Sequence, residues 1–198
     1  MHYVDRHSQE EWPMSNESRT SMVRSAASLI STRGVSATSF SDVLADSGAP
    51  RGSIYHHFPD GKKQLAADAV RWTAERVRDH QRRCPATSAE EILNWFVAMW
   101  RGVVVGSHGA AGCAIAGVAL DSPADEELLL GVVREAFTSW TDLLTEQLSA
   151  VGLPSERAAS LAVTVLAGME GALILCRAEG GPGPLEAVAA ELLRAVAG

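Results

Sequence analysis

The chain has few cysteines and none of the motifs that mark common enzyme sites. Its three cysteines, Cys84, Cys113 and Cys176, lie far apart and form no CxxC pair. We therefore expect neither a disulfide framework nor a zinc site, and a reducing, cytoplasmic environment. There is no HExxH motif, no nucleophile elbow and no glycine-rich phosphate loop, so the pattern argues against an enzyme and predicts no metal and no cofactor.

Long apolar runs are also missing. The first residues contain no apolar core of signal-peptide length, and residues 1–15 are predicted to form a flexible extension. The most apolar stretch, Leu161 to Cys176, is shorter than the roughly 20 residues of a transmembrane helix, and it carries Glu170 near its middle. We therefore expect no membrane as a partner.

No stretch alternates apolar and polar residues in the manner of a strand. Instead, apolar residues recur three or four positions apart along most of the chain, which is typical of amphipathic helices. Glycine and proline separate these patterns at Gly34, Pro85, Gly106–Gly112 and Gly180–Pro184. The sequence predicts an all-α protein of about nine helices, one of which is expected to begin at Ser122 and Pro123.

Acidic residues outnumber basic ones, but the excess is uneven. Residues 15–84 carry eleven Lys and Arg against seven Asp and Glu, whereas residues 85–198 carry five against fourteen. A uniformly acidic protein would be a poor ligand for nucleic acid, but here the basic residues gather in one half. Part of that excess lies in residues 62–83, where it is also compatible with an ordinary solvated helix face.

Within the basic half, residues 38–65 predict two short helices joined by a tight turn. Ser39 and Asp42 have the spacing of a capping box, and Gly48 stands where a left-handed C-cap is needed. Pro50 suits the first turn of the next helix. Ile54 and Phe58 are expected to face inward, which leaves a second helix with small and hydrogen-bonding residues outside. This is the pattern of a helix-turn-helix with a recognition helix for the DNA major groove, although a chance αα-hairpin has similar spacing.

The same segment resembles the DNA-binding domain of the TetR family of bacterial repressors. It reads TSFSDVLADSGAPRGSIYHHFPDGKKQL and contains the family's Y-x-H-F pattern as Tyr55, His57 and Phe58. The extra residue between Phe58 and Lys62 is typical of the LmrA/YxaF-like branch. The resemblance implies a helix-turn-helix domain over residues 16–61 and a ligand-binding and dimerisation domain over residues 62–198.

The resemblance also implies roles in binding an operator in double-stranded DNA. Backbone phosphates are expected at Thr38, Ser39, Tyr55 and His57. Lys62, near the start of a helix, and Lys63 are expected to add phosphate contacts. Arg51 and Ser53 are predicted to reach base edges, since arginine pairs bidentately with guanine. The full predicted interface is Thr38, Ser39, Pro50, Arg51, Gly52, Ser53, Tyr55, His56, His57, Lys62 and Lys63.

The C-terminal half is predicted to form the dimer and the ligand pocket. Residues 161–176 are apolar on nearly all sides, which favours burial against a partner subunit over a wholly intramolecular core. The resemblance implies a homodimer through the last two helices and a small-molecule inducer. Most aromatics at helical spacing belong to the core, but some could line a pocket for a flat apolar ligand. The candidates are Trp72, Trp95, Phe96, Trp100, His108, Phe137, Trp140 and Glu170, with Arg101 as a further polar candidate.

Together these features predict a homodimeric repressor that a small apolar or aromatic ligand releases from a palindromic operator. The helix from Lys62 to about Cys84 is expected to transmit the ligand signal by a change of tilt. A ligand-independent DNA-binding regulator and a transcriptional activator remain as alternatives. Catalysis by His56 and His57 is not favoured, because adjacent residues on a helix point in different directions.

Overall fold

The computed structural model describes residues 11–197, and every regular element in that range is an α-helix. In chain order the helices are α1 (Glu11–Arg33), α2 (Phe40–Ser47), α3 (Ser53–His57), α4 (Gly61–Arg82), α5 (Ala89–Gly106), α6 (Ala114–Asp121), α7 (Glu127–Ala150), α8 (Ser155–Glu179) and α9 (Gly183–Ala197). The prediction of an all-α chain is confirmed. Helix α1 begins inside the segment predicted as a flexible extension, and residues 1–10 of that segment lie outside the described residues.

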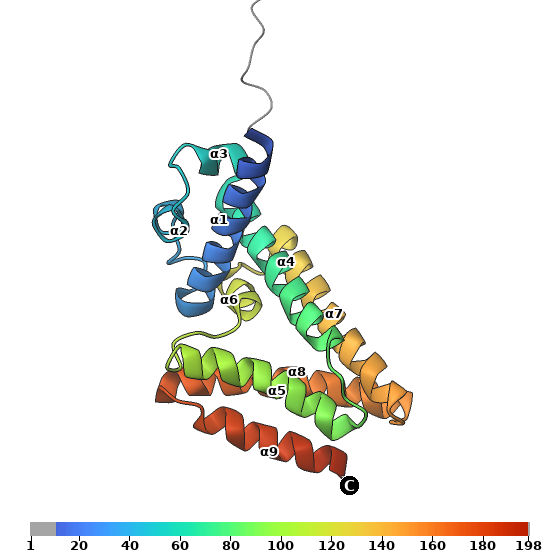
Figure 1. The fold of residues 1–198 in the computed structure, drawn as a ribbon. Coiled ribbons are helices and arrows are strands. Elements are labelled where there is room, and N and C mark those ends of the chain that lie inside the picture. The colour runs from blue at the N-terminus through green and yellow to red at the C-terminus, as the bar shows by residue number, and fades with distance from the viewer. Residues whose placement is uncertain (1–10, 198) are drawn as a thin grey trace, which may run out of the picture.

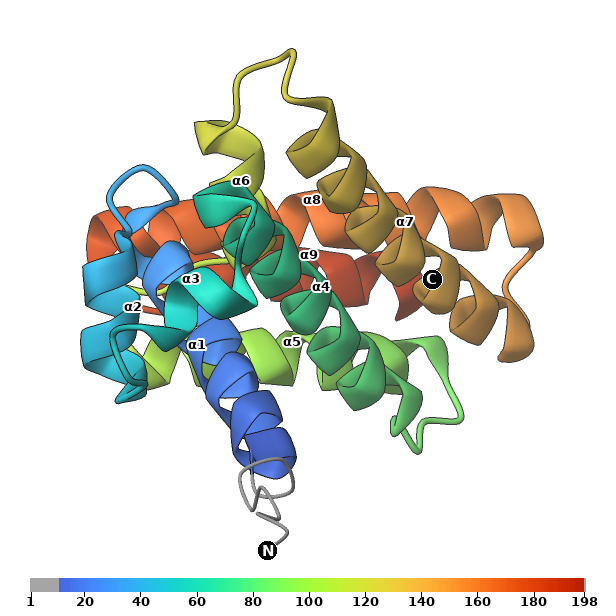
Figure 2. The same cartoon turned by 90° about the horizontal axis from the view of Figure 1, so that it is seen from above.

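The helices form two groups joined by α4 (Figure 1). Helices α1 to α3 lie together at one end, while α5, α8 and α9 form a layer at the other. Helix α4 runs from the first group toward the second and packs along α7. Seen from above, α4 and α7 cross over the layer of α5, α9 and α8 (Figure 2). Helix α6 contacts α1, α4 and α7, so it lies where the two groups meet.

One continuous apolar core runs through both groups. In the first group, Ile54 of α3 and Phe58 just after it are fully covered, at 0% and 1% exposure, as their spacing predicts. Helix α4 extends this core through the buried Leu65 and Val70, and it packs on both α1 and α7. The short helix α3 is therefore held in place by tertiary packing, because a helix of this length is not stable alone.

Two helix starts differ from the sequence prediction. Helix α3 begins at Ser53, after Pro50, because the Ser53 N–H donates to the Pro50 carbonyl at 3.0 Å and closes a turn. Ser122 ends α6 and does not begin α7. The Glu126 N–H donates to the Pro123 carbonyl at 3.0 Å, so a further turn delays α7 until Glu127.

Helix α8 is apolar on both sides but covered on only one. It is the one helix of residues 11–197 that is long and apolar enough to cross a membrane by composition, and 44% of its most apolar window is buried. The covered side packs on α7 and α9. Val163, Ile174 and Leu175 on the other side are 58%, 59% and 52% exposed.

Candidate nucleic-acid interface and ligand cavity

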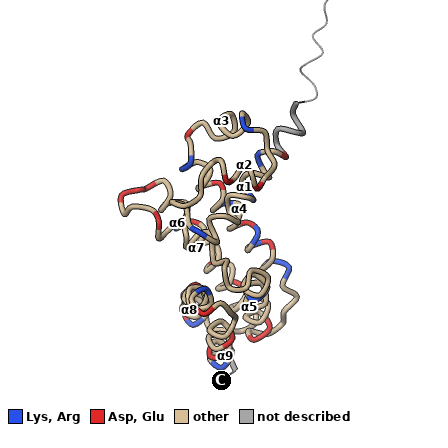
Figure 3. Tube along the Cα trace, turned by 90° about the vertical axis from the view of Figure 1, so that its left-hand side faces the viewer, with Lys and Arg blue, Asp and Glu red and all other residues tan. Residues whose placement is uncertain are grey.

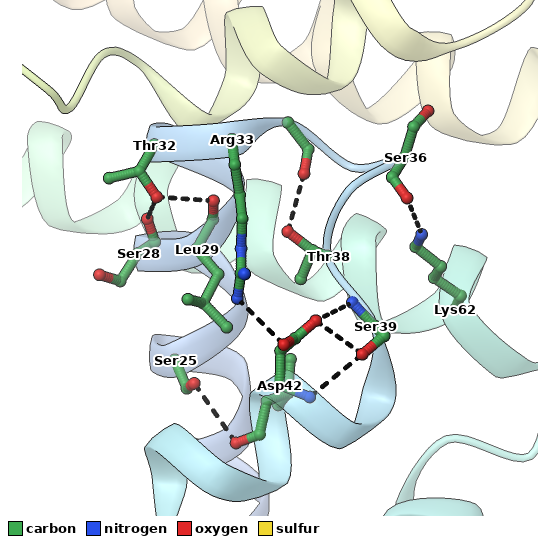
Figure 4. Close-up of polar contacts among 12 residues, drawn as sticks. Ser25, Ser28, Leu29, Thr32, Arg33, Ser36, Thr38, Ser39, Asp42 and Lys62 are labelled. Carbon is green, nitrogen blue, oxygen red and sulfur yellow. Dashed lines mark hydrogen bonds and ion pairs between the residues drawn. The ribbon is translucent and has the colours of Figure 1, made fainter.

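The N-terminus of α2 is fixed by the predicted capping box (Figure 4). The Asp42 N–H donates to the Ser39 hydroxyl at 3.2 Å, and the Ser39 N–H donates to the Asp42 carboxylate at 2.9 Å. The Ser39 hydroxyl also donates to this carboxylate at 2.6 Å. These donors, with the Arg33 guanidinium 3.5 Å away, hold the pKa of Asp42 below its usual value. Ser39 is exposed, so the capped helix end faces solvent.

The turn after α2 follows the prediction. Gly48 has φ 69° and donates its N–H to the Leu44 carbonyl at 3.1 Å, as a left-handed C-cap does. Pro50, Arg51 and Gly52 follow and are all exposed. Ser53 is half-buried, and its hydroxyl donates to the Pro50 carbonyl at 2.7 Å. The turn therefore presents the Arg51 side chain at the start of α3.

Helix α3 points its polar residues outward. Tyr55 is 69% exposed, and its ring packs against that of Phe40 in an edge-to-face arrangement with the centroids 5.7 Å apart. His56 is exposed and His57 is half-buried. Burial, with smaller effects from His56 and Arg19, lowers the pKa of His57. The lowered pKa favours the neutral form of the imidazole.

Thr38 corrects one expectation. Its side chain was predicted to meet a phosphate, but the residue is only 4% exposed. The hydroxyl donates to the Gly34 carbonyl at 2.7 Å and stabilises the bend between α1 and α2. The expectation came from the position of Thr38 in the family motif, and that position does not predict how deeply the side chain is buried.

The two lysines both have acceptors within the protein. Lys62 is the second residue of α4, and its Nζ donates to the Ser36 carbonyl at 3.1 Å (Figure 4). Lys63 forms an ion pair with Glu126 in the loop between α6 and α7. That loop carries a run of acidic residues (Figure 3). A phosphate that binds Lys63 must therefore compete with Glu126.

A cavity of about 420 Å³ lies between α1, α4, α5 and the start of α6. Its apolar wall includes Trp72, Val77, Met99, Trp100 and Val103. Arg24, Arg76, Asp79, His80 and Arg83 supply charged or ionisable groups. The cavity touches α4, which leads directly to Lys62, and Gly112 to Ala114, which lead into α6.

The predicted pocket residues do not all meet in this cavity. Trp72 and Trp100 line it, and Trp95 stacks on His80 beside it with the ring centroids 4.8 Å apart. Phe96 and Trp140 are buried and pack with Trp100 in the core, and Phe137 packs on Trp140. His108 is exposed, in a turn with φ 53° after α5, and it does not line this cavity.

Glu170 lines a second cavity, of about 340 Å³, between the end of α1, α6 and α8. Burial raises the pKa of Glu170 to about 7, and its Oε1 has no hydrogen-bond donor among the described residues. Cys113 lines both cavities, and the pKa of its thiol is raised by burial and by the nearby Glu170. Arg101 lies elsewhere and binds Glu186 at 2.5 and 2.7 Å, joining α5 to α9.

Several residues of these sites have no signal in the sequence. Arg24, Arg76 and Arg83 are ordinary surface arginines by spacing, and only the packing of α1 on α4 brings them to one cavity. Asp121 accepts the Ser36 N–H at 3.0 Å across 85 positions of sequence. Among the described residues, no group of three or more His, Cys, Asp or Glu residues could hold a metal ion.

Comparison with known proteins matches both halves of the chain. Residues 23–69 match the pattern of the bacterial regulatory proteins of the tetR family, and residues 89–191 match the LmrA/YxaF-like C-terminal domain of transcriptional regulators. The chain is 38% identical over 179 residues to the HTH-type transcriptional regulator Rv0196 of Mycobacterium tuberculosis, covering 88% of this chain and 91% of that protein. It is 29% identical over 161 residues to the HTH-type transcriptional regulator LmrA of Bacillus subtilis, covering 80% and 86%. A TetR transcriptional regulator of Chloroflexus aurantiacus has a similar crystal structure, with a TM-score of 0.75, 28% identity and coverage of 92% and 95%.

Proposed function

Since the chain belongs to the TetR family of bacterial transcriptional regulators, with an LmrA/YxaF-like C-terminal domain, we propose that it is a homodimeric repressor released from its operator by a small ligand. Proteins of this family are regulators that bind DNA through the helix-turn-helix, and they are not enzymes. A protein that binds bacterial operator DNA acts in the cytoplasm, where that DNA lies.

The exposed surface of the helix-turn-helix carries this proposal. Arg51 reads base edges in the major groove, with Ser53 beside it as a hydrogen-bond acceptor. Tyr55 and His57 bind backbone phosphates from different faces of α3. Ser39 and Lys62 bind phosphate at the adjoining ends of α2 and α4. The support is that Ser39, Arg51 and Tyr55 are exposed on elements whose apolar faces are fixed in the core.

The dimer is proposed to form through α8 and α9. The uncovered apolar face of α8, with Val163, Ile174 and Leu175 more than half exposed, is the main support. Exposed apolar patches of this kind mark protein interfaces. A two-fold dimer places two copies of α3 about 34 Å apart, which fits two half-sites one helical turn apart in a palindrome.

The ligand is proposed to bind in the cavity between α1, α4, α5 and α6. A small aromatic or apolar molecule fits its apolar wall and its volume of about 420 Å³. Binding must favour a conformation in which the two copies of α3 no longer match the half-sites, since a ligand shifts an equilibrium only by its difference in affinity for the two states. Regulation without a ligand, and activation in place of repression, are the alternatives.

DNase footprinting on the DNA upstream of the chain's own gene tests the proposal. We expect protection of a palindrome whose half-sites are about one helical turn apart. Transcription in vitro from that promoter distinguishes a repressor, which lowers transcript yield, from an activator, which raises it. A chain that protects no palindrome at micromolar concentration would contradict the proposed function.

A further inference from the structure

The lining of the proposed ligand cavity carries more positive than negative charge. Three arginines line it, Arg24 from α1 and Arg76 and Arg83 from α4. Among the described residues, none of the three has a carboxylate within ion-pair distance, although many other arginines of the chain do. The one carboxylate of the lining, Asp79, already faces Arg82 at 3.5 Å.

Arg76 is held against the aromatic wall of the cavity. The Arg76 guanidinium lies over the Trp72 ring, 5.0 Å from its centroid. This contact holds a planar set of N–H donors beside an aromatic surface at the cavity. An aromatic ring placed against the wall would therefore bring an attached carboxylate or phenolate oxygen near a guanidinium.

We propose that the cavity binds a flat aromatic anion, a carboxylate or a phenolate, in preference to a neutral or cationic aromatic compound. This inference rests on the proposed function, because it names the class of ligand for that site. The apolar wall holds the ring, and Arg76 and Arg83 bind the negative oxygen. The arginines are exposed at the rim, so their effect is moderate and falls with added salt.

Calorimetric titration of the full-length protein with a matched pair of probes tests this preference. The probes are 2-naphthoate and 2-naphthamide, which share a ring system and differ in charge. We expect 2-naphthoate to bind about tenfold more tightly at low salt, as one charge-assisted hydrogen bond at a partly solvated site would produce. Replacing both arginines, Arg76→Gln with Arg83→Gln, should bring the two dissociation constants within about twofold and leave that of 2-naphthamide nearly unchanged.

A control variant separates the charge effect from damage to the fold. Arg78→Gln changes an arginine of α4 that lies outside the cavity and is bonded to Glu75 at 2.7 Å, and it should keep the preference for 2-naphthoate.

Other results would overturn the inference. Equal binding of the two probes, no binding of either at millimolar concentration, or an unchanged preference in the double arginine variant would each exclude the proposed class. Operator release measured with the same probes distinguishes this failure from failure of the proposed function. A protein that leaves its operator with 2-naphthamide but not with 2-naphthoate is a ligand-released regulator with a different ligand class. If the protein binds no operator, the proposed function as a DNA-binding regulator is wrong, whatever the preference between the probes.

Discussion

Gly52 has an ordinary helical backbone, with φ −74° and ψ −22°, and open space where a Cβ would stand. Its own conformation therefore does not require glycine, unlike that of Gly48 with φ 69°. We expect Gly52→Ala to change the free energy of unfolding by less than about 1 kcal/mol. Alanine is a poorer N-cap than glycine, but it also lowers the conformational entropy of the unfolded chain, and the two effects oppose each other. Operator affinity should fall by about tenfold or more, because the new methyl group stands where the backbone approaches DNA.

Gly102 supplies the matched control for this residue. It lies on the exposed side of α5, also with open space at its Cβ position. Gly102→Ala should raise the free energy of unfolding by up to about 1 kcal/mol and leave operator affinity unchanged. Urea denaturation and gel-shift titration measure both quantities. If Gly52→Ala bound the operator as tightly as the native chain, close backbone approach at this position would be excluded.

Glu170 makes stability depend on pH. Its pKa is about 7 in the folded chain against 4.5 for an ordinary glutamate, so folding favours the protonated carboxyl. This contribution is present in full below about pH 4.5 and is lost as the pH rises through about 7. Glu170→Gln stays neutral, so relative to this variant the native chain should lose roughly 2 kcal/mol between about pH 5 and about pH 8. Urea titrations at the two pH values check this, and parallel losses in both proteins would mean that Glu170 is ionised throughout.

At the scale of elements, the sequence predicts a feature well where the residues that define it lie close together in the chain. The capping box of α2 and the C-cap at Gly48 involve residues three or four apart, so the printed order of residues contains them. Thr38 and His108 show the limit, because burial depends on what packs above a residue. The rim arginines of the cavity and the Asp121 contact join segments far apart in sequence. The periodic pattern of apolar residues does not predict which distant segments come into contact.

The contact between α6 and the helix-turn-helix gives a prediction for signal transmission. The start of α6 lines the cavity, and its last residue, Asp121, accepts the Ser36 N–H at 3.0 Å. The Lys62 Nζ donates to the Ser36 carbonyl at 3.1 Å. Movement of α6 therefore pulls on the segment that leads to the capped end of α2. Asp121→Ala should reduce the factor by which a ligand weakens operator binding by about fivefold, with ligand affinity in the absence of DNA unchanged.

Asp125→Ala is the control for this experiment, because Asp125 is an exposed carboxylate in the adjoining loop with no ion pair among the described residues. It should leave the ligand effect intact. Operator titrations with and without ligand give the coupling factor for each protein. An Asp121→Ala protein with the native factor would show that α4, the helix expected from the sequence to transmit the signal, acts without help from α6.

At the scale of the whole molecule, the proposed dimer through the uncovered face of α8 determines how the operator should be bound. Val163, Ala167, Gly171 and Ile174 share that face, and a Cβ on Gly171 would meet open space in the single chain. Gly171→Arg therefore leaves the fold of the subunit intact but puts a long charged side chain into the proposed interface. We expect its mass in solution to fall from twice 21.0 kDa to 21.0 kDa.

Operator affinity should fall together with the dimer. Two linked recognition helices bind a palindrome as one unit, and separate subunits lose the effective concentration that the link provides, by a factor of about 100 or more. Gly102→Arg introduces the same side chain on another open helix surface, on α5, and should remain a dimer with native affinity. Light scattering gives the mass and gel-shift titration the affinity. A Gly171→Arg protein that stays dimeric and binds normally would move the interface away from α8, and the half-site spacing would then have to come from a different pairing of subunits.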